Sequence, residues 1–236
     1  MAQSGLGHQN GVLGVSGSNP DAPILKFHLR KRKFDIIFKK CIINGMDIYE
    51  IIKKRRTIRR FKQKEIPVEL LEKFVDMARI APSGANMQPI EYIIVNDREI
   101  LDEIFPLTRW AGYLGKDGPP PEGKRPVAYI VILINKEINS PTPEYDVGAA
   151  VENILLSATY EGIGSCWIAS INREKLREIL KIPENYEIDS IVALGYPDEK
   201  SVIEEFTGSV KYWKDEKGIM HVPKRDLKDV LHYNKF

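Results

Sequence analysis

The sequence contains few of the residues that build disulfide frameworks and metal centres. It has two cysteines in 236 residues, Cys41 and Cys166, and no Cys-x-x-Cys pair. Its four histidines lack the spacing of a zinc site and lie at His8, His28, His221 and His232. We therefore expect no bound metal and no structural disulfide, and the low cysteine content favours the reducing cytoplasm.

Long apolar runs and the common nucleotide and hydrolase motifs are also missing. No uninterrupted apolar segment approaches the roughly 20 residues that span a bilayer. The first 25 residues lack a basic start followed by a hydrophobic block, so we expect neither a membrane anchor nor export. Gly162-Ile163-Gly164 is only a fragment of a dinucleotide fingerprint, and no phosphate-binding P-loop motif is present. A Rossmann crevice and a hydrolytic triad are therefore not supported.

The formal net charge of +2 is unevenly distributed along the chain. Residues 1–45 hold seven Lys and Arg against two Asp, which gives this segment a charge of +5 and leaves −3 for the remainder. The basic residues between Lys26 and Lys40 form no recognisable nucleic-acid-binding motif. We therefore do not expect nucleic acid as a partner.

Residues 1–45 also differ from the rest in composition. Gly5 to Pro20 is rich in Gly, Ser and Asn and has no periodic apolar face, so it is expected to be disordered. A regular helical pattern begins only at Met46-Asp47, where Asp47 can cap a helix and Glu50 can complete a capping box. We predict a non-native or disordered extension over 1–45 and one folded domain over 46–236. A genuine N-terminal arm is the alternative.

From Met46 onward, helical and strand patterns alternate. Apolar spacing predicts helices at Ile48–Ile52, Val68–Ala78, Tyr145–Glu161 and Arg173–Leu180. β-branched and aromatic runs predict strands at Tyr92–Val95, Val127–Ile134, Ser165–Ala169 and Ile188–Leu194, followed by a turn at Gly195-Tyr196-Pro197. Val127–Ile134 is nearly all apolar, as in a central strand buried on both faces. Trp110–Arg125 reads as a long functional loop.

A basic segment follows the first predicted helix. Arg55, Arg56 and Arg59 surround Thr57, and such crowded charges repel each other unless an anion lies among them. Guanidinium groups beside a hydroxyl suit a phosphate. The alternative is a solvated helix end, which we prefer for the neighbouring cations Arg60, Lys62 and Lys64.

A turn rich in amide side chains lies further along the chain, at Pro82-Ser83-Gly84-Ala85-Asn86-Met87-Gln88-Pro89. Its hydroxyl and amide groups can match the mixed donors and acceptors of a polar ring edge. The same sequence is also compatible with an ordinary turn.

Five motifs in this order resemble the nitroreductase-like flavoproteins. They are Arg55-Arg56-Thr57-x-Arg59, Ala81-Pro82-Ser83-x-x-Asn86-x-Gln88-Pro89, Asp146-x-Gly148-Ala149-Ala150 with Asn153, Gly162-x-Gly164-x-x-Trp167, and a basic terminus. The resemblance covers about 46–236. It implies an α+β fold in which helices surround a central mixed or antiparallel sheet, and an obligate homodimer with a long buried interface helix, here Tyr145–Glu161.

The resemblance also implies where flavin mononucleotide (FMN) would bind. Contacts to the phosphate and ribityl chain are implied for Arg55, Arg56, Thr57 and Arg59, joined by Lys224 and Arg225 of the tail. The loop that meets the ribityl chain and the isoalloxazine ring, often from the partner subunit, is implied for Pro82, Ser83, Gly84, Asn86 and Gln88. A backbone amide facing flavin N5 is implied within Trp167, Ile168, Ala169 and Ser170. Many relatives have Gly or Glu-Gly at the position of Ala169-Ser170, which leaves the N5 donor open. Trp167 is equally compatible with a position in the core.

The activity implied by the resemblance is FMN-dependent oxidation of NADH or NADPH. A small-molecule acceptor, such as a nitroaromatic compound or a quinone, would then be reduced in the same pocket with ping-pong kinetics. No catalytic side chain is assigned, and Trp110, Tyr113 and Trp167 are candidates for shaping the pocket. Two alternatives remain: different flavin chemistry on this fold, either reductive dehalogenation or flavin-fragmenting oxygenation, and a non-catalytic FMN-binding protein. Cys166 is expected to be a small buried hydrophobe.

Overall fold

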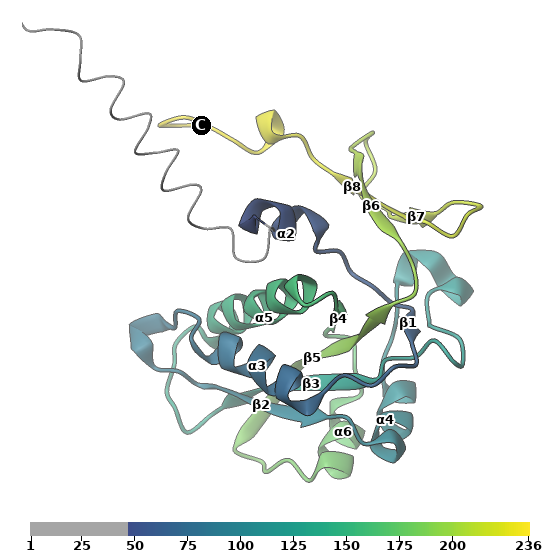
Figure 1. The fold of residues 1–236 in the computed structure, drawn as a ribbon. Coiled ribbons are helices and arrows are strands. Elements are labelled where there is room, and N and C mark those ends of the chain that lie inside the picture. The colour runs from purple at the N-terminus through teal and green to yellow at the C-terminus, as the bar shows by residue number, and fades with distance from the viewer. Residues whose placement is uncertain (1–46) are drawn as a thin grey trace, which may run out of the picture. The chain divides into compact units, whose positions relative to one another are not determined.

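The computed structural model describes residues 47–236 (Figure 1). The predictions for residues 1–45, and the domain boundary at Met46, lie outside the described residues. Within 47–236, no helix is long and apolar enough to cross a membrane. The same part of the chain contains no cluster of His, Cys, Asp or Glu side chains suited to a metal ion.

The helices and strands follow the predicted order, with several additions. The α-helices are α2 (Ile48–Lys54), α3 (Val68–Arg79), α4 (Arg98–Ile104), α5 (Pro143–Tyr160) and α6 (Arg173–Leu180). The strands are β1 (Phe61–Lys62), β2 (Ile90–Val95), β3 (Ala128–Asn135), β4 (Gly164–Ile168), β5 (Tyr186–Pro197), β6 (Ser201–Glu205), β7 (Trp213–Lys214) and β8 (Met220–Lys224). Short 3₁₀ turns occur at Gly84–Asn86, Phe105–Leu107, Gly112–Asp117 and Leu227–Asp229.

The main sheet is antiparallel throughout. Its strand order is β1-β5-β3-β2, and β4 also pairs with β5. Strand β3 lies between β2 and β5, and all but its last residue are buried, which confirms the prediction of an internal strand buried on both faces. Gly195-Tyr196-Pro197 was predicted as a turn, and this is wrong. These residues extend β5, where they pair with β4 and β1.

Helices cover both faces of the main sheet (Figure 1). On one face, alternate β3 side chains such as Ile130 and Ile132 pack in a core shared with α3 and α5. On the other face, Val131 and Leu133 pack in a second core shared with α4 and α6. This alternation follows from the two-residue period of a strand. It gives the predicted α+β class, with helices around an antiparallel sheet.

Helix α4, the two-residue strand β1 and a second sheet were not predicted. Helix α4 is short, and its N-terminus is capped by the Asp97 carboxylate, which accepts the backbone N–H groups of Glu99 and Ile100. A second sheet follows β5, with strand order β6-β8-β7, in which β6 and β8 are parallel. The tail from Ser201 to Lys224 is therefore an ordered part of the described chain.

The observed helix caps agree in part with the caps predicted from the sequence. The Asp47 carboxylate accepts the backbone N–H of Tyr49 as an N-cap. Glu50 does not complete the predicted capping box through its side chain, because its carboxylate pairs with Lys53 at 3.1 Å. At the far end of α5, Gly162 adopts a φ of +74°, as expected for a glycine that ends a helix.

Candidate functional site

The basic segment runs along the outer edge of β4. After α2 ends, Thr57 forms a parallel bridge with Ser165. The Ile58 backbone N–H donates to the Ser165 carbonyl at 2.9 Å. Strand β4 pairs with β5 along its other edge, so the basic segment covers the start of β4 and leaves Trp167 to Ser170 next to it. The structure thus brings two of the predicted site segments together.

Arg55 and Arg56 have different partners. The Arg55 Nε lies 3.6 Å from the Glu152 carboxylate on α5. Arg56 donates from its terminal nitrogen to the carbonyls of Ile52 and Lys53, at 3.3 and 3.1 Å, and so caps the C-terminus of α2. Burial lowers the pKa of the Arg56 guanidinium, and the neighbouring charge of Arg55 lowers it further. This corner of the molecule therefore carries an excess of positive charge.

Two nitrogens of the basic segment are buried without a hydrogen-bond partner. They are the Nε atoms of Arg56 and Arg59. The Arg59 guanidinium carbon lies 5.0 Å from the centre of the Tyr212 ring, so the aromatic face supports the charge but accepts no conventional hydrogen bond. A buried unpaired donor costs about 1–3 kcal/mol. A negatively charged acceptor is the partner that such a donor lacks.

The predicted solvated role of Arg60 is wrong. Its side chain is only 15% exposed and lies 3.4 Å from Glu199, whose carboxylate is 3% exposed. Arg60 also donates to the Asp117 carbonyl at 2.8 Å. Lys62 and Lys64 are both exposed, as predicted, and the Lys64 ammonium lies 4.2 Å from the centre of the Tyr196 ring. The sequence could not show this because Glu199 is 139 residues away.

The loop at 82–88 is held in an unusual conformation by Asp146. Ala85, Asn86 and Gln88 have positive φ angles of 48°, 56° and 52°, a region that costs roughly 1–2 kcal/mol for a residue with a Cβ. The buried Asp146 carboxylate accepts the Ser83 hydroxyl at 2.7 Å and the Gly84 N–H at 2.9 Å. Strained backbone that the surroundings enforce is common at ligand sites.

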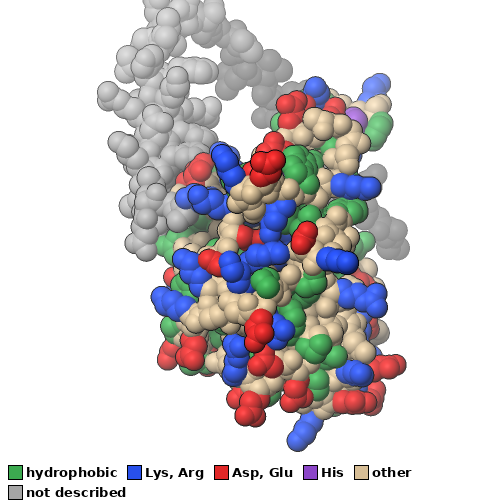
Figure 2. Space-filling view, turned by 90° about the vertical axis from the view of Figure 1, so that its right-hand side faces the viewer, with side chains coloured by type: hydrophobic (Ala, Val, Ile, Leu, Met, Phe, Trp, Pro, Cys, Tyr) green, Lys and Arg blue, Asp and Glu red, His purple; other side chains and the backbone are tan. Residues whose placement is uncertain are grey.

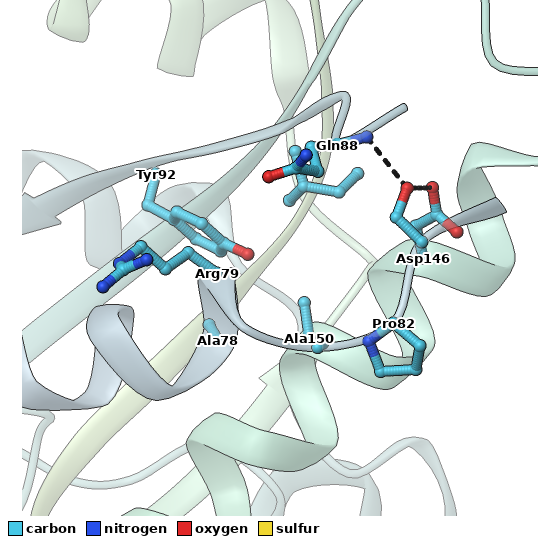
Figure 3. Close-up of a pocket in the computed structure, with 10 residues that line it drawn as sticks. Ala78, Arg79, Pro82, Gln88, Tyr92, Asp146 and Ala150 are labelled. Atoms are coloured by element: carbon cyan, nitrogen blue, oxygen red, sulfur yellow. Dashed lines mark hydrogen bonds between the residues drawn. The ribbon is translucent and has the colours of Figure 1, made fainter. Parts of the chain in front are cut away.

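Figure 3 shows how the same interactions continue to Gln88. The Ser83 hydroxyl accepts the Gln88 backbone N–H at 2.9 Å, while the Gln88 side chain donates to the Asn86 carbonyl. Beneath the loop lies a cavity of about 150 Å³, whose lining includes Asp146, Gln88 and Tyr92. Burial raises the pKa of the Tyr92 hydroxyl to about 12, so that group stays protonated at neutral pH. Asp146 was part of a recognised motif, but its role in holding the loop was not predicted.

Helix α5 connects the loop with the basic segment. Asp146 holds the loop, and Glu152 faces Arg55 six residues later. Six helical residues correspond to about 9 Å along the axis. Two predicted site segments that lie far apart in sequence are therefore both fixed to one helix.

The segment Trp167–Ser170 is exposed at every residue except Ile168. Trp167 is 44% exposed and donates its indole N–H to the Ser190 hydroxyl at 2.7 Å, so it is not a core residue in this chain. Ile168 is buried in the core shared with α4 and α6, and only its backbone remains near the edge. Ala169 and Ser170 are exposed and line a hollow of about 740 Å³.

The loop candidates for shaping the pocket divide into one core residue and one exposed residue. Trp110 is 6% exposed and donates to the Thr108 hydroxyl at 2.7 Å, so it lies in the core, and its role in shaping the pocket remains a prediction. Tyr113 is exposed, and its ring centre lies 5.0 Å from that of Tyr212. Tyr212 in turn contacts Arg59, so the loop reaches the basic segment through a residue that the sequence did not single out.

The basic tail residues lie at and just after the end of the second sheet. Lys224 ends β8, and Arg225 donates to the Asp229 carbonyl at 2.6 Å. Among the described residues, the structure shows no hydrogen bond or ion pair that joins either side chain to Arg55–Arg59. Their predicted phosphate contact remains a prediction.

Cys166 behaves as expected for a buried hydrophobe. Its thiol lies in the core shared with α4 and α6, and burial raises its pKa to about 12. A thiol with such a pKa is almost entirely protonated at neutral pH and is a poor nucleophile.

Comparison with known proteins identifies the family. The family model for nitroreductases matches residues 52–113 and 123–196. The chain belongs to the nitroreductase family. The two matched stretches contain the basic segment, the 82–88 loop, α5 and β4.

Individual relatives agree with this assignment. A protein of Archaeoglobus fulgidus, named as an NADH dehydrogenase/NAD(P)H nitroreductase, is 37% identical over 163 residues, covering 66% of this chain and 88% of its own. An iodotyrosine deiodinase of Thermotoga neapolitana is 28% identical over 166 residues, covering 64% and 89%. The solved FMN-dependent nitroreductase of Clostridium difficile R20291 superposes with a TM-score of 0.56 at 29% identity, covering 79% and 98%.

A glycine allows the basic segment to lie against β4, and this gives a testable prediction. A Cβ on Gly164 would lie 2.9 Å from the Ile58 Cβ, closer than real side chains approach. We expect Gly164→Ala to lower the free energy of unfolding by about 1–3 kcal/mol, as overpacking does. Urea unfolding measures this change.

The matched control is Gly112→Ala, because a Cβ there meets nothing within 4 Å. Equal stability of the Gly164→Ala variant and the wild-type protein would show that the basic segment does not depend on this close approach.

Proposed function

We propose that this member of the nitroreductase family is an FMN-dependent NAD(P)H oxidoreductase. The observation that carries the proposal is the pair of buried, unpartnered guanidinium nitrogens on Arg56 and Arg59 beside β4. These positively charged donors lack an acceptor, and the phosphate of FMN would provide a negatively charged one. The FMN dependence of the similar Clostridium difficile enzyme supports the same cofactor.

Each segment of the site has a role in this proposal. Arg55, Arg56, Thr57 and Arg59 would hold the phosphate and the ribityl chain. The loop residues Pro82, Ser83, Gly84, Asn86 and Gln88 would meet the ring or the ribityl chain, and Asp146 keeps that loop in shape. The exposed edge from Trp167 to Ser170 would face flavin N5 with a backbone amide. Bound FMN would supply the two-electron chemistry, accepting a hydride from NADH or NADPH and reducing an acceptor.

The protein's own residues contribute the placement of the flavin and the positive charge around its phosphate. The positive charge around Arg55 and Arg59 stabilises the dianionic phosphate through charge-assisted hydrogen bonds. No side-chain acid or base is assigned, because placement of the flavin and its two substrates accounts for the reaction. The donor and the acceptor would use one face in turn, which predicts ping-pong kinetics.

A homodimer is part of the proposal. Large apolar side chains remain exposed on α2, at the start of α5 and in the C-terminal tail, at Ile48, Tyr49, Ile52, Tyr145, Leu227, Tyr233 and Phe236. Contiguous exposed apolar surface marks interaction sites. Pairing would bury these side chains and would allow the 82–88 loop of one subunit to reach the flavin of its partner. Sedimentation equilibrium measures this association.

Reductive dehalogenation is the second candidate function, because of the similarity to the iodotyrosine deiodinase of Thermotoga neapolitana. Both functions require FMN and differ in the acceptor. An aromatic acceptor would find Tyr113 and Tyr212 close to Arg59. Assays with a nitroaromatic compound, a quinone and an iodotyrosine therefore distinguish them.

The deciding experiment is an anaerobic titration of the purified, FMN-reconstituted protein with NADH and with NADPH. We expect a yellow protein whose flavin absorbance near 450 nm is bleached and then restored by an acceptor. A protein that stays colourless after reconstitution contradicts every flavin function. A yellow protein whose flavin absorbance is bleached by neither NADH nor NADPH indicates a non-catalytic FMN-binding protein.

A further inference from the structure

A second concentration of positive charge adjoins the basic segment at Arg60, where β1, the end of β5 and the β7–β8 turn meet. It surrounds a hollow of about 540 Å³, large enough for a small organic anion. Five cationic side chains line it, and they are Arg60, Lys124, Lys200, Lys214 and Lys217. We call this hollow the lysine pocket. Figure 2 views the molecule from the right-hand side of Figure 1, and on this face Lys and Arg side chains are interspersed with Asp and Glu side chains.

The carboxylates of the lysine pocket are already neutralised. The Glu199 side chain is 3% exposed, and its carboxylate lies 3.4 Å from Arg60 and 3.1 Å from Lys214. It also accepts the Arg59 backbone N–H at 2.6 Å. Asp198 pairs with Lys124 at 2.9 Å. Two carboxylates against five cations leave the pocket with a formal charge of +3.

Lys200 and Lys217 carry the unbalanced charge. Within residues 47–236 the structure shows no ion pair or side-chain hydrogen bond for either ammonium group, and both line the hollow. Like charges that converge on one hollow repel each other, and a bound anion would remove that repulsion. The arrangement therefore favours a multiply charged anion over a neutral or cationic ligand.

The wall of the pocket is a fixed turn. Asp215 accepts the Ile219 backbone N–H at 2.7 Å, which closes the β7–β8 turn between Lys214 and Lys217. That hydrogen bond lowers the pKa of the Asp215 carboxyl. His221 lies 2.6 Å from Glu204 and 3.3 Å from Asp215, and its ring stacks on Trp213. Lys214 and Lys217 thus flank or lie in a braced turn, which reduces the entropy lost on binding a ligand.

We propose that the lysine pocket binds a phosphate group at a site separate from the proposed FMN phosphate anchor. Arg60, Lys200, Lys214 and Lys217 would contact the phosphate oxygens, and Glu199 would hold Arg60 and Lys214 in place. The phosphate could be the 2′-phosphate of a nicotinamide dinucleotide or a free phosphate or pyrophosphate ion. The chemistry of recognition is the same in both cases.

Isothermal titration calorimetry tests the proposal with the full chain, both saturated with FMN and without added FMN. The probes are pyrophosphate, inorganic phosphate, 2′,5′-ADP and 5′-AMP. We expect saturable 1:1 binding of a phosphate probe that persists when FMN is present. Tighter binding of 2′,5′-ADP than of pyrophosphate identifies a nucleotide 2′-phosphate as the source, and the reverse order identifies a free ion.

The affinity of the Lys200→Gln/Lys217→Gln variant for the phosphate probe should be lower by on the order of tenfold or more, because two unpaired charges are lost. Its matched control is Lys62→Gln/Lys181→Gln, which removes the same charge from exposed positions outside the pocket. FMN content should be unchanged in both variants. Absence of saturable binding to the wild-type protein, or equal weakening in the control variant, overturns the proposal. Because the titration does not require flavin, its result is independent of the proposed oxidoreductase activity.

Discussion

Replacing Arg55 and Arg59 together with alanine is expected to weaken FMN binding by on the order of 100-fold or more. Each charge-assisted hydrogen bond to a phosphate contributes about 1.5–3 kcal/mol, and the two guanidinium groups together account for the loss. Arg59 is chosen because its Nε is buried without a partner, and Arg55 because it adds charge beside β4. Fluorescence titration of the apoprotein with FMN measures the dissociation constant.

The matched control for this variant is Lys62→Ala/Lys64→Ala. It removes two positive charges from the same stretch of chain, but Lys62 is exposed and Lys64 lies over Tyr196. We expect FMN affinity within about twofold of wild type, since exposed charges are screened by salt. Equal losses in both double variants would mean that net charge, and not the geometry around Thr57, attracts the cofactor. Undiminished affinity in the Arg55→Ala/Arg59→Ala variant would show that the phosphate binds elsewhere.

Replacing Asp146 with alanine is expected to lower the free energy of unfolding by about 2–4 kcal/mol. The Ser83 hydroxyl and the Gly84 N–H would both lose a charged acceptor. The loop would also lose the contacts that hold Ala85, Asn86 and Gln88 at positive φ. Because the loop is proposed to meet the flavin, FMN affinity should fall by roughly tenfold as well. Urea unfolding and FMN titration give the two quantities.

Glu144→Ala is the control for Asp146→Ala. Glu144 occupies the same first turn of α5, so its removal changes the helix-end electrostatics in the same direction, but its side chain is exposed. We expect a change in stability below about 0.5 kcal/mol and unchanged FMN affinity. An Asp146→Ala variant that binds FMN like wild type, despite lower stability, would separate the loop from the cofactor site.

The sequence predicted most of the main sheet and its helices. The apolar run that became β3 is buried on both faces, as its composition required, and α3 and α5 begin and end within two residues of their predicted bounds. Strand β5 was predicted too short at its C-terminal end because Gly195 and Pro197 are typical turn residues. Gly195 is instead required by packing, since a Cβ there would lie 2.7 Å from Phe61.

The second sheet could not be predicted from its local pattern. Strands β6 and β8 are short and half exposed, and their parallel pairing joins segments that flank an irregular stretch. Short edge strands carry weak periodicity, so they resemble loops in a single sequence. The lysine pocket was not predicted because its cations come from four separate stretches of chain, which only the fold brings together.

The sequence alone determined the order of motifs, and that order was sufficient for the family and for the α+β class. It also singled out Arg55, Arg56, Thr57 and Arg59, since crowded like charges around a hydroxyl are conspicuous in any conformation. Tertiary structure decided which cations have partners. Glu199 neutralises Arg60 from 139 residues away, whereas the Nε atoms of Arg56 and Arg59 stay buried and unpaired. Pairing depends on distances across the fold, and those distances are absent from the order of residues along the chain.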